Sequence, residues 1–243
     1  MRKILITGGL GKIGSYFATN FHTAYDIKIA DLATNDAAFP GNVTTVQADL
    51  MDYAVCEKLC EGIDTVLHLA GIVDPVSESD ALLETNIKTT QHLFKAAAKA
   101  GCKRVIFASS AQTIESYPTD VQVTENIVVK PKNTYGVSKC FGEALAAYYA
   151  YNKGISAICL RIGAYEFVED FTEMNARDLS AFLHPDDLNQ LLVGCIETEG
   201  IQYEVLNAIS DNRYKRLAIT EAITKVGYAP KADAFELFRL KRD

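Results

Sequence analysis

The sequence predicts an α/β fold with a doubly wound parallel sheet. Two observations support this prediction. Short β-branched segments alternate with longer helical segments from the first residue to about residue 161, an order typical of this class. Most of the short segments are apolar with little alternation, as expected of strands buried on both faces of a parallel sheet. The fold class is therefore a Rossmann-type sheet.

The elements follow from the same pattern. Six strands are expected in the first two thirds of the chain, at 3–7, 26–31, 43–48, 64–70, 103–110 and 155–161. Helices are expected between them, near 12–23, 52–60, 79–100 and 134–152.

The last third of the chain does not continue the regular alternation of strands and helices. Its sequence predicts a helix near 186–198 that opens with HPDD, a strand at 203–208, a helix near 213–226 and a short amphipathic end. No linker rich in Pro, Gly or Ser separates it from the rest. We therefore expect one domain over residues 1–243, in which 162–243 form a small substrate-binding elaboration.

Composition argues against several classes of function. The net charge of −7 argues against a nucleic-acid partner, because phosphate binding needs clustered Lys and Arg. No run of 18 or more apolar residues is present, so no membrane span or membrane partner is expected. The N-terminus lacks the pattern of a cleaved signal. Six scattered cysteines indicate reduced thiols and a cytoplasmic protein, and no metal site is expected.

The helix at 134–152 is apolar on nearly every face. A surface helix normally carries one apolar stripe. One side is expected to meet the sheet and another a second subunit, which predicts a homodimer or larger homo-oligomer. The alternative is that the C-terminal segment covers this helix.

Residues 7–14 read TGGLGKIG, directly after a strand and at the start of a helix. In that context Gly8 permits a tight turn, Gly11 lets a pyrophosphate approach the backbone, and Gly14 lets helix and strand pack closely. The helix N-terminus adds free N–H groups and partial positive charge. These residues predict a nucleotide site.

Asp31 ends the second strand. A carboxylate there can accept hydrogen bonds from both ribose hydroxyls and would repel a 2′-phosphate. Lys12 could favour a phosphate, but a lysine in the first turn of a helix is usually a solvated charge. The expected cofactor is therefore NAD rather than NADP.

Several further motifs occur in order: GxxGxxG spacing, Asp49-Leu50, HLAG at 68–71, Asn86 and YGVSK at 135–139. Over roughly residues 1–165 the chain thereby resembles the extended short-chain dehydrogenase/reductase family, in the NAD-dependent epimerase/dehydratase superfamily. The resemblance implies that Asn86 steadies the central helix near the active site. It also implies that the cofactor contacts a set of residues from several motifs: Lys12, Ile13, Asp49, Leu50, Leu69, Ala70, Gly71, Asn86 and Tyr135.

Tyr135 and Lys139 lie four apart on a helix, so they share a face. A phenol is a poor base at neutral pH, but a neighbouring ammonium and a positive nicotinamide should lower the pKa of Tyr135. Lys139 can also hold the nicotinamide ribose. The serine pair of FASS offers a third member, and family spacing points to Ser110. Tyr135 is then expected to remove a hydroxyl proton while the same carbon loses hydride.

Substrate choice depends on a narrower resemblance. FASSAQTIESYP, LRIG, RDLSAFLHPDD and VGYAPKADAFE are similar to the uronate dehydrogenase branch, which implies NAD-linked oxidation of a cyclic hexuronic acid at C1 to an aldarolactone. Arg177 falls where that branch places an arginine that grips the substrate carboxylate, and a guanidinium suits a carboxylate. The alternative is an exposed arginine at a helix start.

The chain also departs from that branch. Ala111 and Gln112 stand where Asn-His is typical, and Ala164 and Val73 replace expected serines. Ser110, Ala111, Gln112 and Arg177 are the expected substrate residues. Because sites that read hydroxyls reject analogues lacking them, losing such groups should change specificity. The substrate is then expected to be another sugar or a smaller hydroxy acid.

The leading hypothesis is an NAD-dependent dehydrogenase of a sugar or sugar acid. A second hypothesis keeps the site but returns the hydride, as in an NAD-retaining epimerase or dehydratase. A third is a non-catalytic NAD-sensing regulator, although such proteins tend to lack the Tyr-Lys pair.

Overall fold

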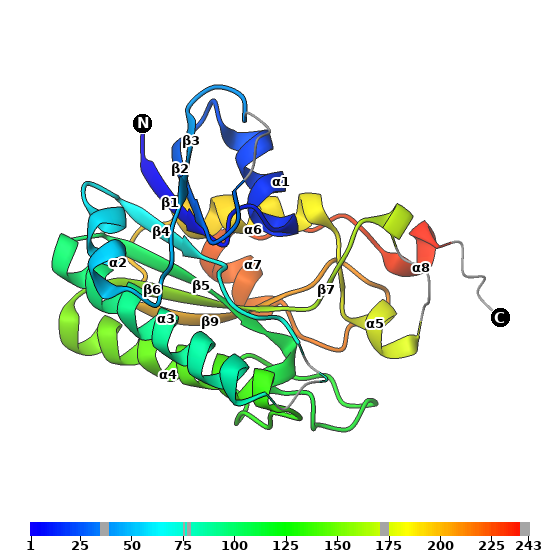
Figure 1. The fold of residues 1–243 in the computed structure, drawn as a ribbon. Helices are drawn as coiled ribbons and strands as arrows, with labels where there is room; N and C mark the ends of the chain where they lie inside the picture. The colour runs from blue at the N-terminus through cyan, green and yellow to red at the C-terminus, as the bar shows by residue number, and fades with distance from the viewer. Residues whose placement is uncertain (35–38, 75, 77–78, 171–174, 239–243) are drawn as a thin grey trace.

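The computed structural model describes residues 1–34, 39–74, 76, 79–170 and 175–238. A seven-stranded sheet runs through the molecule in the order β3-β2-β1-β4-β5-β6-β9, with every neighbouring pair parallel (Figure 1). The doubly wound α/β prediction is confirmed, and each of the seven predicted strands is present. Their bounds are Lys3–Thr7 (β1), Asp26–Asp31 (β2), Val43–Gln47 (β3), Thr65–His68 (β4), Arg104–Ser110 (β5), Ser156–Ile162 (β6) and Tyr203–Ala208 (β9).

Helices cover both faces of the sheet (Figure 1). Strand β1 shows why, because successive side chains point to opposite faces. Ile4 and Ile6 belong to one hydrophobic cluster and Leu5 to another. The first cluster contains side chains of α1 (Lys12–Phe21), α6 (Pro185–Glu197) and α7 (Thr220–Val226), and the second those of α2 (Tyr53–Cys60), α3 (Asp80–Ala100) and α4 (Thr134–Lys153).

The last third of the chain contributes to the same sheet. Strand β9 pairs with β6, and α6 and α7 complete one face. Short elements that the sequence did not predict lie between them, since two to five residues carry no readable periodicity. They are η1 (Ala111–Thr113), β7 (Ala164–Tyr165), η2 (Val168–Asp170), α5 (Ala176–Ser180), β8 (Phe182–Leu183) and α8 (Ala234–Leu237).

One predicted helix has the wrong start. The helix expected near 213–226 begins only at Thr220. The residues before it are extended beside Val123, whose N–H donates to the Arg216 carbonyl at 2.8 Å and whose carbonyl accepts from Ala218 at 2.9 Å. Leu217 is fully buried there. This pairing joins segments more than 90 residues apart, so local helical periodicity could not reveal it.

The HPDD segment is a helix start, as predicted. The His184 ring accepts a hydrogen bond from the Asp186 N–H at 3.2 Å, and Pro185 occupies the first turn of α6. Among the described residues no helix is long and apolar enough to cross a membrane.

Candidate active site

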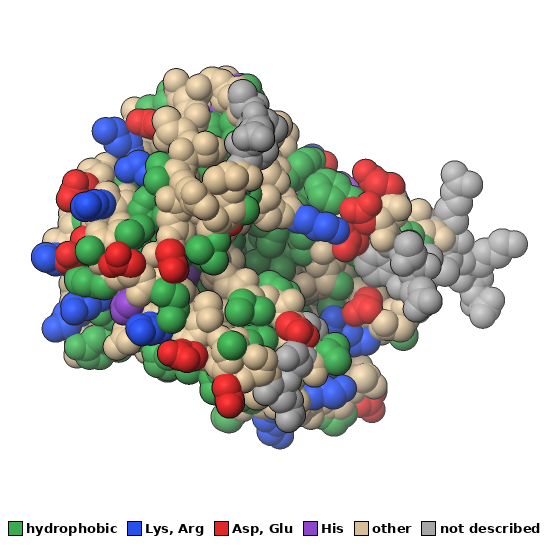
Figure 2. Space-filling model, viewed as in Figure 1, with side chains coloured by type: hydrophobic (Ala, Val, Ile, Leu, Met, Phe, Trp, Pro, Cys, Tyr) green, Lys and Arg blue, Asp and Glu red, His purple; other side chains and the backbone are tan. Residues whose placement is uncertain are grey.

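A cavity of about 840 Å³ opens at the carboxyl ends of the strands. Figure 2 shows it as a hollow near the centre of that face. Its lining residues come mainly from the turns after β1, β2, β3 and β4, from the ends of β5 and β6, and from α1, α3 and α4. In doubly wound sheets ligands bind at this edge, where the strand order reverses, and the volume suits a sizeable organic ligand.

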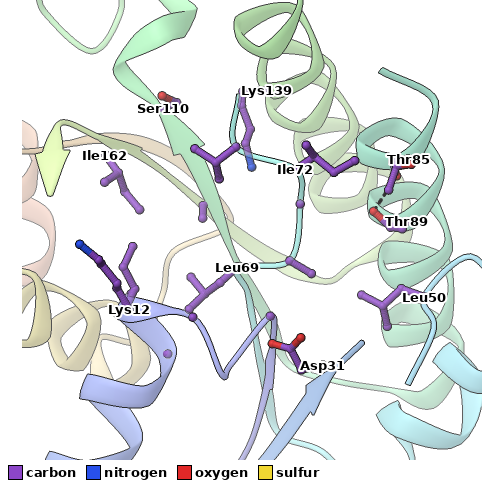
Figure 3. Close-up of a pocket in the computed structure, with 18 of the residues that line it drawn as sticks. Lys12, Asp31, Leu50, Leu69, Ile72, Thr85, Thr89, Ser110, Lys139 and Ile162 are labelled. Atoms are coloured by element: carbon purple, nitrogen blue, oxygen red, sulfur yellow. Dashed lines mark hydrogen bonds between the residues drawn. The ribbon is translucent and has the colours of Figure 1, made fainter. Parts of the chain in front are cut away.

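The glycine-rich segment 7–14, here called the glycine turn, forms one wall of the cavity (Figure 3). Gly8 has a φ of 65°, and a Cβ there would lie 2.7 Å from the backbone nitrogen and Cα of Ala70. The turn therefore excludes a side chain for two reasons, conformation and close approach. Helix α1 begins after Gly11, which provides no side-chain cap. The first N–H groups of α1 are left available to an anion.

Asp31 faces the glycine turn (Figure 3). Its Oδ2 accepts a hydrogen bond from Leu10 N–H at 3.0 Å, and its Oδ1 accepts from Ala33 N–H at 3.1 Å. Lys12 is not a free cation: its Nζ donates to Glu166 at 2.6 Å and to Asp170 at 3.4 Å. The only described lysine of the glycine turn is thus matched by two carboxylates.

Asn86 does not line the cavity; it holds the wall in place. Its Oδ1 accepts from Ile72 N–H at 2.8 Å, and its Nδ2 donates to the Ile72 carbonyl and to Ser138 Oγ, both at 3.1 Å. Asn86 thereby ties α3 to the loop after β4 and to α4. The loop itself supplies the predicted lining residues Leu69, Ala70 and Gly71, and Asp49 and Leu50 line the cavity beside it.

Tyr135 and Lys139 lie near the start of α4, which Asn133 caps by accepting the Gly136 N–H at 2.7 Å. Both side chains are buried yet line the cavity. The Lys139 Nζ lies 5.5 Å from the centroid of the Tyr135 ring. The structure therefore brings the predicted pair together.

The pKa of Tyr135 is shifted in the opposite direction to that expected from the sequence. Burial raises the pKa of Tyr135 to about 12, although a hydrogen bond with Ser110 lowers it in part. Burial also lowers the pKa of Lys139 to about 8. The expected lowering of the Tyr135 pKa is thus wrong for the protein alone, because desolvation of the phenolate outweighs its stabilisation.

His68 is fully buried near Lys139 and is uncharged. Its Nδ1 is 2.7 Å from Thr7 Oγ1, and its Nε2 is 3.2 Å from Thr90 Oγ1. The Thr90 hydroxyl donates to the Asn86 carbonyl at 2.7 Å, so His68 Nε2 must be the donor and Nδ1 the acceptor. Burial, with a smaller contribution from the Lys139 charge, lowers the pKa of His68 to about 3.

The two serines at the end of β5 have different partners. Ser109 Oγ donates to Glu143 at 2.6 Å, and Glu143 forms a buried two-bond ion pair with Arg161 at 2.8 and 2.9 Å. Both serines line the cavity, but Ser110 interacts with Tyr135 and partly lowers the pKa of its phenol. Sequence reasoning missed Glu143 and Arg161, since an isolated Glu on a helix and an Arg in a strand give no signal.

The predicted substrate residues are only partly brought together. Gln112 and Arg177 line the cavity, but Ala111 is buried in the core at the start of η1. The Arg177 guanidinium forms two hydrogen bonds with Glu115, at 3.0 and 2.8 Å, and one with Asp178 at 2.8 Å. These contacts outweigh burial and raise the pKa of Arg177. Glu115, in the ESYP stretch, is a residue that sequence reasoning missed.

Together these features define a class of protein. A turn that admits no Cβ, an uncapped helix N-terminus and a carboxylate at the end of β2 fit a dinucleotide at the carboxyl edge of a parallel sheet. The fold and the site are those of a Rossmann-type dinucleotide-binding protein. Residues 4–188 match the NAD dependent epimerase/dehydratase family, and the chain belongs to that family.

Known proteins similar to the chain include several dehydrogenases. A uronate dehydrogenase of Pseudomonas putida is 32% identical over 238 residues, covering 98% of this chain and 86% of the relative. An NAD-dependent glucose-6-phosphate dehydrogenase of Haloferax volcanii is 30% identical, covering 96% and 94%. A mutant uronate dehydrogenase of Agrobacterium tumefaciens, solved in complex with NAD, is 29% identical with a TM-score of 0.89, covering 98% and 88%.

Proposed function

We propose that the protein is an NAD-dependent dehydrogenase that oxidises a hydroxyl group of a sugar or sugar acid. The observation that carries this proposal is the meeting of Ser110, Tyr135 and Lys139 at one cavity whose other end is the glycine turn. The dehydrogenases similar to the chain support the same reaction class.

The cofactor would lie along the carboxyl edge of the sheet. Gly8, Gly11, Lys12, Ile13 and Gly14, which line the cavity, would surround the pyrophosphate, and Asp31 would accept hydrogen bonds from the ribose hydroxyls. Asp49 and Leu50 lie at the adenine end, and Leu69, Ala70 and Gly71 along the middle. When bound, NAD⁺ supplies a carbon that accepts hydride.

The protein's own groups manage the proton and the geometry. Tyr135 takes the proton of the substrate hydroxyl, while the hydrogen on the same carbon leaves with its electron pair. Ser110 donates a hydrogen bond to the reacting oxygen, and the charge of Lys139 favours the phenolate. Lys139 would also hold the nicotinamide ribose. The balance is one alcohol and NAD⁺ converted to one carbonyl, NADH and a proton.

NADH formation tests this function. The protein is incubated with NAD⁺ and a panel of uronates, aldoses and 2-hydroxy acids, and absorbance of NADH is followed, with NADP⁺ in parallel. Sustained NADH production with at least one sugar is expected. No NADH from any member, together with isomerisation of a nucleotide sugar, would instead identify an epimerase that keeps its NAD.

We further propose a homodimer in the cytoplasm. Val137, Tyr148 and Tyr151 of α4 are exposed, at 45, 47 and 61%. Large exposed apolar side chains along one helix are typical of a subunit interface. Sedimentation of the protein and of Tyr151→Glu measures this, and a monomeric wild-type protein would contradict it.

A further inference from the structure

We propose that the carboxylate of Glu115 neutralises the guanidinium of Arg177, so that the cavity binds a neutral aldose in preference to a uronate. The inference rests on the proposed dehydrogenase function and names its substrate class. Glu115 thereby becomes a specificity-determining residue.

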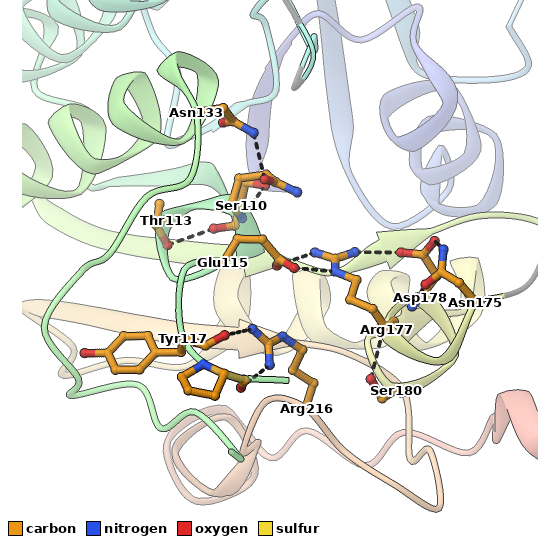
Figure 4. A network of polar contacts seen from close by, with 12 residues as sticks. Ser110, Thr113, Glu115, Tyr117, Asn133, Asn175, Arg177, Asp178, Ser180 and Arg216 are labelled. Carbon is orange, nitrogen blue, oxygen red and sulfur yellow. Dashed lines mark hydrogen bonds and ion pairs between the residues drawn. The ribbon is translucent and has the colours of Figure 1, made fainter. Parts of the chain in front are cut away.

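The geometry is that of a preformed carboxylate complex (Figure 4). Glu115 approaches Arg177 side-on, with Nε to Oε1 at 3.0 Å and Nη2 to Oε2 at 2.8 Å. This paired arrangement is the one a guanidinium offers to a substrate carboxylate. Asp178 takes a third N–H through Nη1 at 2.8 Å. Three of the five N–H donors of Arg177 are therefore committed to carboxylates of the protein itself.

The ion pair is also anchored on both sides. Arg216 donates to the carbonyls of Tyr117 and Pro118 at 2.9 Å, which fixes the backbone just after Glu115. On the other side, Asn175 caps α5 by accepting the Asp178 N–H at 2.9 Å. The side chains of Glu115 and Arg177 are only 11 and 22% exposed. Separating them would leave Glu115 with a poorly solvated charge.

The other basic side chains among the described lining residues of the cavity are poorly placed to bind a substrate carboxylate. Among its described lining residues the basic side chains are Lys12, Lys139 and Arg177. Lys12 is paired with Glu166 and Asp170, and Lys139 is buried beside Tyr135. The carboxylate of a uronate would therefore approach a guanidinium that is already paired with the carboxylates of Glu115 and Asp178. The negative charges of these two groups would repel it.

Neutral hydroxyl groups find better partners here. Gln112 lines the cavity, and its Oε1 accepts from Asn133 Nδ2 at 2.9 Å, which leaves its Nε2 as a hydrogen-bond donor. A sugar hydroxyl can accept a hydrogen bond from this donor without adding charge to the cavity.

The test uses pairs of substrates that differ only at C6: D-glucose with D-glucuronate, and D-galactose with D-galacturonate. We expect kcat/KM of the wild-type enzyme to favour the aldose of a pair by about tenfold or more, equivalent to about 1.4 kcal/mol. Glu115→Gln and Glu115→Ala should shift the ratio toward the uronate by about tenfold. Glu204→Gln is the control, because it removes the same charge from an ion pair with Lys225 outside the cavity lining.

Direct binding separates this inference from the proposed function. Calorimetric titration of the NADH-loaded protein with D-glucuronate requires no turnover, and Glu115→Gln should bind it about tenfold more tightly than wild type. Thermal melting and NADH affinity show whether each variant is folded. A wild-type preference for uronates, or unchanged glucuronate affinity in the Glu115→Gln variant, would overturn the inference while leaving the dehydrogenase intact. Aldose selectivity in binding with no NADH formation would instead remove the dehydrogenase proposal.

Discussion

The carboxylate of Asp31 accepts a hydrogen bond from the backbone N–H of Leu10 at 3.0 Å. The group that we propose selects the cofactor therefore also helps to hold the backbone of the glycine turn. Removing its charge and removing its hydrogen bond are two different perturbations, and they should have different consequences.

We predict that Asp31→Asn lowers the preference for NAD over NADP by about tenfold or more in kcat/KM. The amide keeps one acceptor oxygen, which can still accept from Leu10 N–H, but it loses the second oxygen that accepts from Ala33 N–H and the charge that repels a 2′-phosphate. Parallel kinetics with both cofactors measure this ratio. Asp31→Ala should in addition lower affinity for both cofactors, since the Leu10 hydrogen bond is lost. Equal NAD preference in wild type and Asp31→Asn would contradict the role of this charge.

Gly8→Ala should destabilise the protein by about 3 kcal/mol and abolish cofactor binding, because its Cβ would meet the Ala70 backbone at 2.7 Å in a left-handed conformation. Gly62→Ala is the matched control: Gly62 has a φ of 68°, and nothing lies within 4 Å of its added Cβ. That variant should cost only about 1 kcal/mol. Urea unfolding measures both, and equal losses would show that conformation alone matters.

Tyr135→Phe should reduce kcat by about 10²–10⁴-fold while cofactor affinity changes little, because only the proton-accepting oxygen is lost. Tyr148→Phe removes a hydroxyl from the same helix at a site that is 47% exposed and should leave activity unchanged. Steady-state kinetics and fluorescence titration with NADH make the comparison. Tyr135→Phe with wild-type turnover would contradict a catalytic phenol.

Lys139→Met should inactivate the enzyme and yet stabilise the fold near pH 7. Burial lowers the pKa of Lys139 from 10.5 to about 8, so between these values the unfolded chain binds more protons and stability rises with pH. The folded state carries the full penalty below pH 8, and replacing Lys139 should remove it, a gain on the order of 2 kcal/mol at pH 7.

The gain from Lys139→Met should shrink as the pH approaches 10.5, where the unfolded chain also loses the proton. Denaturant unfolding at pH 7 and pH 10 measures the trend. Lys132→Met, at an exposed position just before α4, controls for the loss of a lysine. A gain that does not depend on pH would refute the electrostatic explanation.

The predictable parts of the site were the local ones. The glycine turn, Asp31 and the Tyr135–Lys139 pair each follow from spacing within one strand, turn or helix. Glu115 and Arg177 are 62 residues apart, and Lys12 and Glu166 are 154 apart. Such pairings depend on how the loops pack in three dimensions. Neither residue of a pair lies in a sequence pattern that would identify its partner. The resemblance predicts Ala111 as a substrate residue, because it stands where the branch has Asn, but in η1 its side chain is buried in the core.

The cavity is assembled from two separate stretches of chain. Its lining residues from Gly8 to Thr89 belong to the proposed dinucleotide site, and those from Ala108 to Arg177 include the proposed reacting groups. Among the described residues, no hydrogen bond or ion pair joins Asp31 to Glu115. The energetic effects of changing these two residues should therefore add. With the roles proposed for Asp31 and Glu115, cofactor preference and substrate charge could be tuned independently and then combined in one chain.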